Sequence, residues 1–344
     1  MYRRCVYKHT NSQTQNNYLQ AIQKFVPCGN RTHDTRRSSQ SLSHCAILES
    51  RQQGQWQGVC NVGKQQSPIN ILSSETVVDK NQVHIRGPLV FRGYKDVELT
   101  AVNNGHTLKW AGVEGDEAPI LSGGPLRGNY TFLQFHFHWL SEHAIDGMKY
   151  PLEVHLVHIK TGLTLDEALL RSDGLAVVGV FFMVNRGYEA GYALEQLTPF
   201  VPYISSSAQN KTESHRIDVT RLLSRQPQSY YTYQGSLTTP MCQEVVTWIV
   251  MDKPLYITAE QYKTFTRVDV GADYIYRSLQ PHNSRVVYRS LASCASSLLP
   301  TGPGKLISLL TCLSTTLAAG VNNGIGSVFD IKRKLAGSNH FRGF

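Results

Sequence analysis

Short apolar segments, many of them alternating with polar residues, fill the chain from Trp56 to about Tyr288, and Gly, Pro, Asn and Asp residues separate them. Alternation with a period of two residues is typical of strands that bury one face of a sheet. Many segments follow one another too closely for a helix between each pair, so the pattern favours a sheet-dominated fold. We predict strands at five of them, which cover residues 97–102, 131–139, 152–159, 175–184 and 244–250.

Helical spacing of apolar residues is brief. It occurs over residues 189–197 and 259–265, which we predict to be helices. Residues 56–290 contain neither an internal repeat nor a central linker. We therefore predict one domain of about 230 residues, which is within the usual size limit of a single domain.

Both flanks of this domain have a different texture. Residues 1–55 are rich in Gln, Asn, Ser and Arg, without sustained apolar periodicity, and we expect a disordered or gene-model-derived segment. They contain no apolar run of the length that a signal peptide requires.

The C-terminal tail, residues 291–344, contains a moderately apolar run at 306–321 and a basic cluster at 332–334. A spanning helix needs about 20 apolar residues, so only an extension to residue 329 would give a weak membrane anchor. A lipid-anchor signal and a disordered tail are the alternatives.

The formal net charge of +9 comes from the flanks. Residues 1–55 carry eight Lys or Arg against two Asp or Glu, and residues 291–344 carry five against one. The middle of the chain is close to neutral. Phosphate binding depends on clustered basic side chains, so we expect no nucleic-acid partner.

Histidines on two of the predicted strands give the clearest chemical signal. His136 and His138 lie two residues apart, so their side chains point to the same face of one strand. His155 lies on the next predicted strand, which is close enough in sequence to be its antiparallel neighbour. Three His ligands with a fourth position left to water are one of the known catalytic zinc sites. We therefore predict that these three residues bind Zn²⁺.

Polar residues beside these histidines support the same interpretation. Gln134 and Glu153 each lie two residues from a predicted ligand on its face of the strand, where they can accept the second ring N–H. His158 points to the opposite face and is predicted to be structural. The alternative is that all these histidines simply line a polar sheet face, but a third His with a carboxylate beside it favours the metal.

These segments resemble the signature of alpha-class carbonic anhydrases. Matching motifs occur in the family's order at residues 66–71, 103–106, 123–126, 134–139, 141–143, 153–158, 173–177 and 236–240. The resemblance implies a mainly β fold with peripheral helices (α+β), a single domain on a large twisted, mostly antiparallel central sheet. It also implies a zinc metalloenzyme, a lyase that catalyses the reversible hydration of carbon dioxide to bicarbonate and a proton.

The resemblance implies further site residues. Thr238 and Glu142 would orient the attacking hydroxide by a hydrogen bond between them, and Thr239 would orient bicarbonate. The wall of the carbon dioxide pocket would comprise Val157, Val177, Leu237 and Trp248. Val157 also shares a strand face with His155.

His106 resembles the family's proton shuttle. An imidazole that titrates near pH 6.5 suits proton transfer in both directions at physiological pH. The alternative is a surface histidine in a turn, because Asn104 and Gly105 precede it.

Two departures from the family pattern bear on efficiency. Met241 stands where the family usually has a second Pro, so a cis peptide is not expected there. Residues 275–278 read Ile-Tyr-Arg-Ser in place of Asn-Trp-Arg-Pro.

The seven cysteines bear on the compartment. By resemblance, Cys60 and Cys242 occupy the positions of the disulfide in extracellular and membrane-anchored carbonic anhydrases, which implies an oxidising compartment. Two buried free thiols are the alternative. Glycosylation sequons at residues 129–131 and 210–212 agree with an extracellular or cell-surface location.

A non-catalytic carbonic-anhydrase-like binding or adhesion domain is the alternative function. Such relatives typically lose one or more of the zinc histidines, whereas this chain keeps all three together with Thr238 and Glu142. The sequence therefore favours an enzyme whose partner is a small molecule, carbon dioxide or bicarbonate, and it leaves the oligomeric state open.

Overall fold

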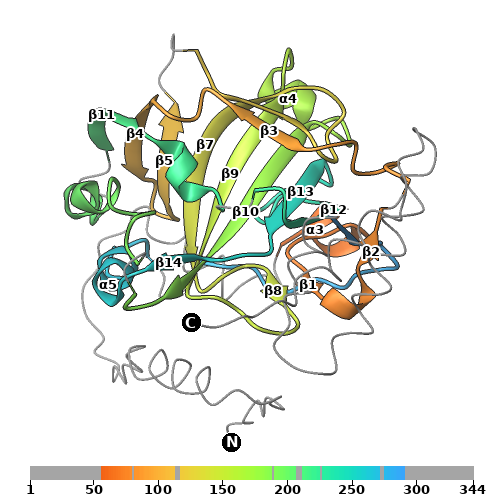
Figure 1. The fold of residues 1–344 in the computed structure, drawn as a ribbon. Helices are drawn as coiled ribbons and strands as arrows, with labels where there is room; N and C mark the ends of the chain where they lie inside the picture. Colours follow the sequence, from red (N-terminus) through yellow and green to blue (C-terminus); the bar gives the residue numbers. More distant parts are fainter. Residues whose placement is uncertain are drawn as a thin grey trace, which may run out of the picture.

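A large twisted sheet organises the computed structural model of the chain, which describes residues 56–79, 81–112, 117–187, 190–206, 211–224, 227–271 and 275–290 (Figure 1). Within these residues the sheet has 13 strands in the order β11-β4-β5-β7-β9-β10-β13-β12-β15-β2, with β14 beside β10 and the β3–β6 pair beside β7. Most neighbours are antiparallel, and β13 and β14 run parallel to β10. This mixed, mainly antiparallel sheet confirms the predicted fold class.

The first half of the described part of the chain supplies nine strands. Its strands are β1 (Asn70–Ile71), β2 (Val77–Val78), β3 (Leu89–Arg92), β4 (Val97–Asn103), β5 (Leu108–Gly112), β6 (Ile120–Gly123), β7 (Tyr130–Trp139), β8 (Ala144–Ile145) and β9 (Leu152–Lys160). β1 and β8 form a separate two-stranded parallel sheet.

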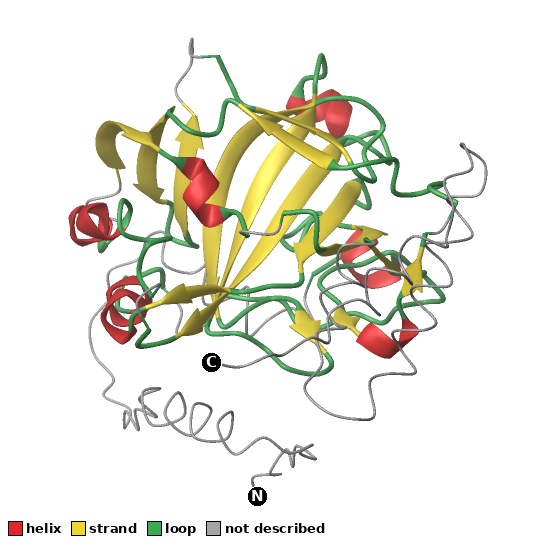
Figure 2. Cartoon of the chain, viewed as in Figure 1, coloured by secondary structure: helices red, strands yellow, loops and turns green. Residues whose placement is uncertain are grey.

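The second half contributes β10 (Leu175–Val184), β11 (Lys211–Ile217), β12 (Tyr230–Gly235), β13 (Val246–Met251), β14 (Leu255–Ile257) and β15 (Tyr288–Arg289). The helical elements are short and lie around the sheet (Figure 2). They are α3 (Val59–Val62), η2 (Ser73–Glu75), α4 (Leu165–Ala168), η3 (Thr198–Ile204), η4 (Val219–Leu222) and α5 (Ala259–Thr266).

The five predicted strands are confirmed as β4, β7, β9, β10 and β13, with ends that differ by at most two residues. The helix predicted at 259–265 is α5, where Thr258 and Gln261 form a capping box. The helix predicted over residues 189–197 is wrong, because the described residues 190–197 form turns. Gly191 has φ 100°, which a right-handed helix does not allow.

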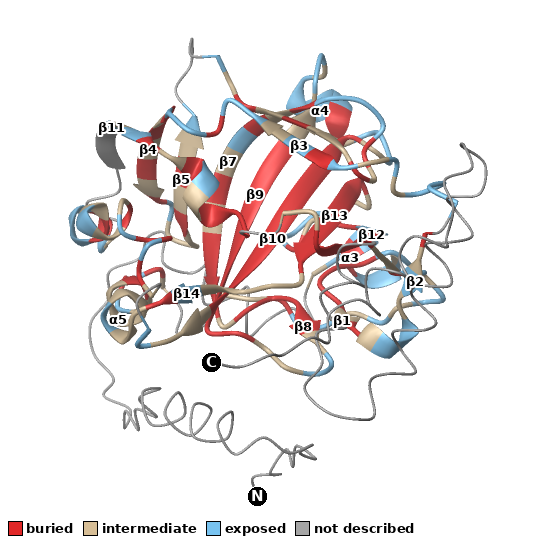
Figure 3. Ribbon diagram, viewed as in Figure 1, coloured by how far each residue is buried: buried red, intermediate tan, exposed pale blue. Residues whose placement is uncertain are grey.

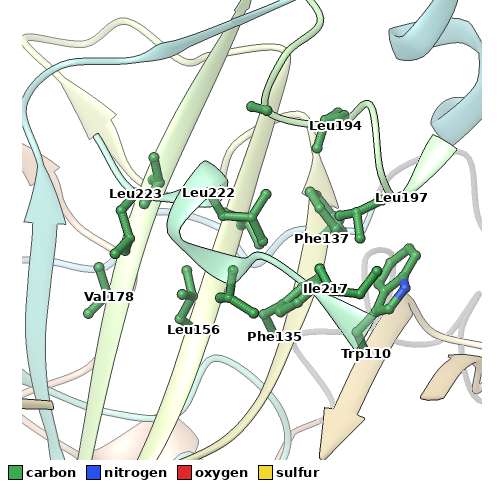
Figure 4. Packing of buried hydrophobic residues seen from close by; sticks show 14 of the residues in the cluster. Trp110, Phe135, Phe137, Leu156, Val178, Leu194, Leu197, Ile217, Leu222 and Leu223 are labelled. Atoms are coloured by element: carbon green, nitrogen blue, oxygen red, sulfur yellow. The ribbon is translucent and has the colours of Figure 1, made fainter. Parts of the chain in front are cut away.

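Buried residues concentrate on the central strands (Figure 3). One apolar cluster lies between the sheet and the segment that includes η4, and Trp110, Phe135 and Phe137 belong to it (Figure 4). A second cluster includes Val157, Val177 and Trp248. β9 and β10 contribute alternate apolar residues to the two clusters, which explains why both strands are buried over most of their length.

β7 carries one extra residue. Its pairing with β9 shifts between Phe132 and Gln134, so Leu133 bulges out and is 41% exposed. A bulge changes which face the later residues occupy. As a result Phe132 and Phe135 both enter the large core cluster, although they are three positions apart. His136 therefore faces away from that core.

A disulfide between Cys60 and Cys242 joins α3 to the loop between β12 and β13. The disulfide that the family resemblance implied is thus confirmed. The proposed flanks, residues 1–55 and 291–344, lie outside the described residues, as does the apolar run at 306–329. Of the helices between residues 56 and 290 that the structure describes, none has the length and apolar character to span a membrane.

Candidate metal centre

Two adjacent strands bring three imidazoles together. In the β7–β9 pair, His136 lies opposite His155, and residues opposite each other in an antiparallel pair share a face. The ring centroids of His138 lie 5.0 Å from His136 and 4.5 Å from His155. One ligand atom from each of the three residues lies within 4.8 Å of the others. The cluster can therefore offer three nitrogens to one ion.

Each ring is oriented by its own acceptor. His136 Nδ1 donates to Gln134 Oε1 over 3.1 Å, and His155 Nε2 donates to Glu153 Oε1 over 2.8 Å. His138 Nδ1 donates to the carbonyl oxygen of Ile275 over 2.5 Å. These bonds fix the tautomers and leave Nε2 of His136, Nε2 of His138 and Nδ1 of His155 for a metal.

The remaining nitrogens fit a metal electronically. His138 Nε2 is buried and has no hydrogen-bond partner among the described residues. Burial, then the adjacent His138 and His155, hold the pKa of His136 well below its ordinary value. Burial also lowers the pKa of His138. Both rings are therefore neutral near pH 7, the form that binds a metal.

Glu153 joins the metal site to a buried hydrogen-bond chain. Besides His155, it accepts from His143 Nδ1 over 2.7 Å and from the His143 backbone N–H over 2.9 Å. Burial alone would raise the pKa of Glu153, but the two histidines hold it well below its usual value. The chain continues from His143 Nε2 to the Tyr233 hydroxyl at 2.7 Å, and from there to Ser67 Oγ at 3.0 Å.

Sequence reasoning did not assign a role to His143 or to the Ile275 carbonyl. His143 directly follows Glu142 in one of the motifs that resemble the family, and this position is the sequence feature that could have indicated its role. The Ile275 acceptor is a backbone atom 137 residues from His138, so no side-chain pattern could have indicated it.

Glu142 lies at the edge of the cluster. Its side chain is buried, and Oε1 accepts from the Arg277 backbone N–H over 2.7 Å. Oε2 lies 3.6 Å from His138 Nε2 and has no hydrogen-bond partner within the described part of the chain. Thr238 is buried in the loop between β12 and β13, but the hydrogen bond predicted from it to Glu142 is not formed in this structure and stays a prediction.

One of the predicted pocket residues, Trp248, lies beside an imidazole, and the others belong to or pack against its apolar cluster. Val177 on β10 pairs with Val157 on β9 and with Trp248 on β13. All three are buried in the second apolar cluster, and Leu237 packs against it. The Trp248 ring centroid lies 4.8 Å from that of His155, so this apolar cluster adjoins the three imidazoles, and its role as the pocket wall stays a prediction.

Two other predicted residues lie in turns. His106 is partly buried between β4 and β5, and its backbone N–H donates to Asn104 Oδ1 over 3.0 Å. The next residue, Thr107, donates its hydroxyl hydrogen to the Phe137 carbonyl and so ties this turn to β7. Thr239 is exposed, and its carbonyl accepts from the Cys242 N–H over 3.0 Å.

Comparison with known proteins gives one family. The family model described as eukaryotic-type carbonic anhydrase matches residues 51–291. Putative carbonic anhydrase 5 of Caenorhabditis elegans is 37% identical over 249 residues, which cover 68% of this chain and 78% of that protein. Carbonic anhydrase 4 of Rattus norvegicus is 34% identical over 79% of this chain and 88% of its own length. Carbonic anhydrase 7 of Homo sapiens is 37% identical over 59% of this chain and 76% of its own length.

Proposed function

Because this chain belongs to the eukaryotic-type, alpha-class carbonic anhydrase family, we propose that it is a zinc enzyme that interconverts carbon dioxide and bicarbonate. One observation carries the proposal. Three imidazoles, each held by a separate acceptor, present their remaining nitrogens within 4.8 Å of one another. This donor set matches the three-His sites of catalytic zinc.

Zinc bound there would lower the pKa of a water molecule to about 7 and so supply a nucleophile at neutral pH. The protein's part is to orient and to bind. Gln134, Glu153 and the Ile275 carbonyl hold the ligand rings. The Glu142 carboxylate is an acceptor that Thr238 would use to aim the attacking oxygen, and Thr239 would orient the product. The apolar wall of Val157, Val177, Leu237 and Trp248 would bind carbon dioxide without competing hydrogen bonds.

Stopped-flow hydration of carbon dioxide by the full chain tests this proposal. We expect a rate above that of buffer, its loss after chelation, and its return when one equivalent of zinc is added. A folded chain that binds zinc without hydration activity would favour the non-catalytic binding domain. A folded chain that takes up no zinc would refute both the metal site and the reaction.

His106→Ala tests proton export separately from the reaction at the metal. General acid–base groups typically contribute about 10²–10⁴-fold, so we expect the maximal hydration rate at low buffer to fall by about 10²-fold. Isotope exchange between carbon dioxide and bicarbonate needs no proton to leave the site and should stay nearly unchanged.

Concentrated imidazole buffer should restore part of the lost rate, and His215→Ala, a variant of a partly buried histidine on β11, should behave like the parent. An unchanged maximal rate for His106→Ala at low buffer would show that His106 is only a turn residue.

We further propose that residues 56–290 form the carbonic anhydrase domain of an extracellular or cell-surface glycoprotein, with the tail as a weak membrane anchor. The Cys60–Cys242 bond supports an oxidising compartment. Asn129 of the first sequon is exposed immediately before β7. Glycosidase treatment of the chain secreted by eukaryotic cells should lower its apparent mass, and a cytosolic, unmodified product would contradict the proposal.

A further inference from the structure

The Lys149 side chain lies against the loop that carries Glu142. Its Nζ donates to the Ser141 carbonyl over 2.7 Å and to the Glu142 carbonyl over 3.3 Å. It also lies 4.1 Å from the centroid of the Tyr276 ring. An ammonium has three N–H donors, and here it faces two carbonyl oxygens and one aromatic face.

These acceptors belong to two segments that meet at the metal site. Ser141 and Glu142 follow β7, whereas Tyr276 is more than 130 residues further along the chain. Tyr276 lies between two residues whose backbone groups hold side chains of the site. The Ile275 carbonyl accepts from His138, and the Arg277 N–H donates to Glu142. The ammonium thus joins the backbone that carries Glu142 to the segment that orients both Glu142 and His138.

A second link between this loop and residues 275–277 is the bond from the Arg277 N–H to the Glu142 side chain, whereas the bonds of the Ser141 side chain are local. Ser141 Oγ donates to the His143 carbonyl and accepts from the Tyr150 N–H, so both bonds stay within residues 141–150. They shape the turn but do not reach residues 275–277. Burial lowers the pKa of Lys149 below its ordinary value, and the nearby Glu142 and Glu153 oppose this shift.

We propose that Lys149 is a positioning residue of the reaction proposed above, on which this inference rests. It holds the Glu142 backbone and the 275–277 segment at a fixed separation, which sets the direction of the Glu142 carboxylate and the orientation of the His138 ring. Lys149 itself touches neither metal nor substrate in this role.

Three variants of the full, zinc-loaded chain test the role. Partners beyond the metal ligands typically affect metal affinity or activity by 10–100-fold, so for Lys149→Met we expect about a tenfold loss of kcat/KM and about tenfold faster zinc loss to a chelator. Lys149→Arg keeps a cation that can donate and stack, and it should recover most of both losses. Lys160→Met is the matched control, because Lys160 is also partly buried but pairs with Asp173 near the far end of β9. It should stay within about twofold of the parent.

A Lys149→Met variant with parental kcat/KM and parental zinc loss would overturn the inference, as would losses that Lys149→Arg does not reduce or that Lys160→Met shares. If Lys149→Met does not fold, Tyr276→Leu, which removes the ring facing the ammonium, should show the same two losses, and parental values would overturn the inference. A parent that binds zinc without activity refutes only the proposed reaction, since zinc loss still reports on Lys149. A parent without zinc refutes both.

Discussion

Replacing His155 by Ala is expected to abolish zinc binding and carbon dioxide hydration together. His155 is buried and oriented by Glu153, and with its two neighbours it completes the only three-nitrogen cluster of the described residues. Even partners outside the ligand set typically contribute 10–100-fold to metal affinity, so loss of a ligand should cost more than about 10²-fold. Zinc content after dialysis and the stopped-flow rate measure the two effects. His136→Ala and His138→Ala should behave alike.

His158→Gln is the matched control for these variants. His158 lies on the same strand but on the opposite face, where its ring contacts the Tyr94 hydroxyl at 2.7 Å. The variant should unfold more easily but retain one zinc per folded chain. Full zinc in all three ligand variants, or its loss in His158→Gln at equal folded fraction, would contradict the assignment.

Removing the disulfide should lower the free energy of unfolding more than any of the other substitutions described above. Cys60 and Cys242 are 182 residues apart in sequence, and such a long closed loop restricts the unfolded chain strongly. We expect the double variant Cys60→Ala/Cys242→Ala to lower the free energy of unfolding by about 2–5 kcal/mol. A typical domain has about 5–15 kcal/mol in total, so the change should be large in a guanidinium titration.

The parent treated with a thiol reductant is the control for this variant and should unfold at a similar guanidinium concentration. Without the cross-link the unfolded chain expands, so the slope of the transition should also rise. Alanine avoids burying a new hydroxyl at two sites that are 6% and 0% exposed. An unfolding midpoint equal to that of the oxidised parent would show that the bond does not contribute to stability.

The strands and the meeting of the three imidazoles could be predicted from alternation. Two His residues lie two positions apart on one strand, and a third lies on the strand that pairs with it. This pairing leaves the three side chains few positions other than one shared face of the sheet. The helix predicted over residues 189–197 was wrong because the spacing of apolar residues does not reveal backbone angles. Their spacing is helical, but Gly191 adopts a positive φ that ends any helix there.

Contacts between distant segments could not be predicted from pattern alone. The Ile275 carbonyl and the Arg277 N–H are backbone groups, so their bonds to His138 and Glu142 depend on where the chain returns after α5. Trp248 came into consideration through family resemblance, because no local periodicity links β13 to His155. Lys149 was missed for a similar reason, since its ring partner lies in a remote segment.

The bulge at Leu133 also determines which residue of β7 could be deleted without disturbing the metal site. It divides β7 into two parts whose alternation is out of phase by one residue, and each part keeps its own pairing with β9. Deletion of Leu133 alone would merge the two parts into one regular strand and leave His136 opposite His155. Deletion of Phe137 would instead make His136 and His138 adjacent, and adjacent residues of a strand point to opposite faces. One-residue deletions only four positions apart thus differ completely: the first spares the metal site, and the second separates its ligands without replacing any of them.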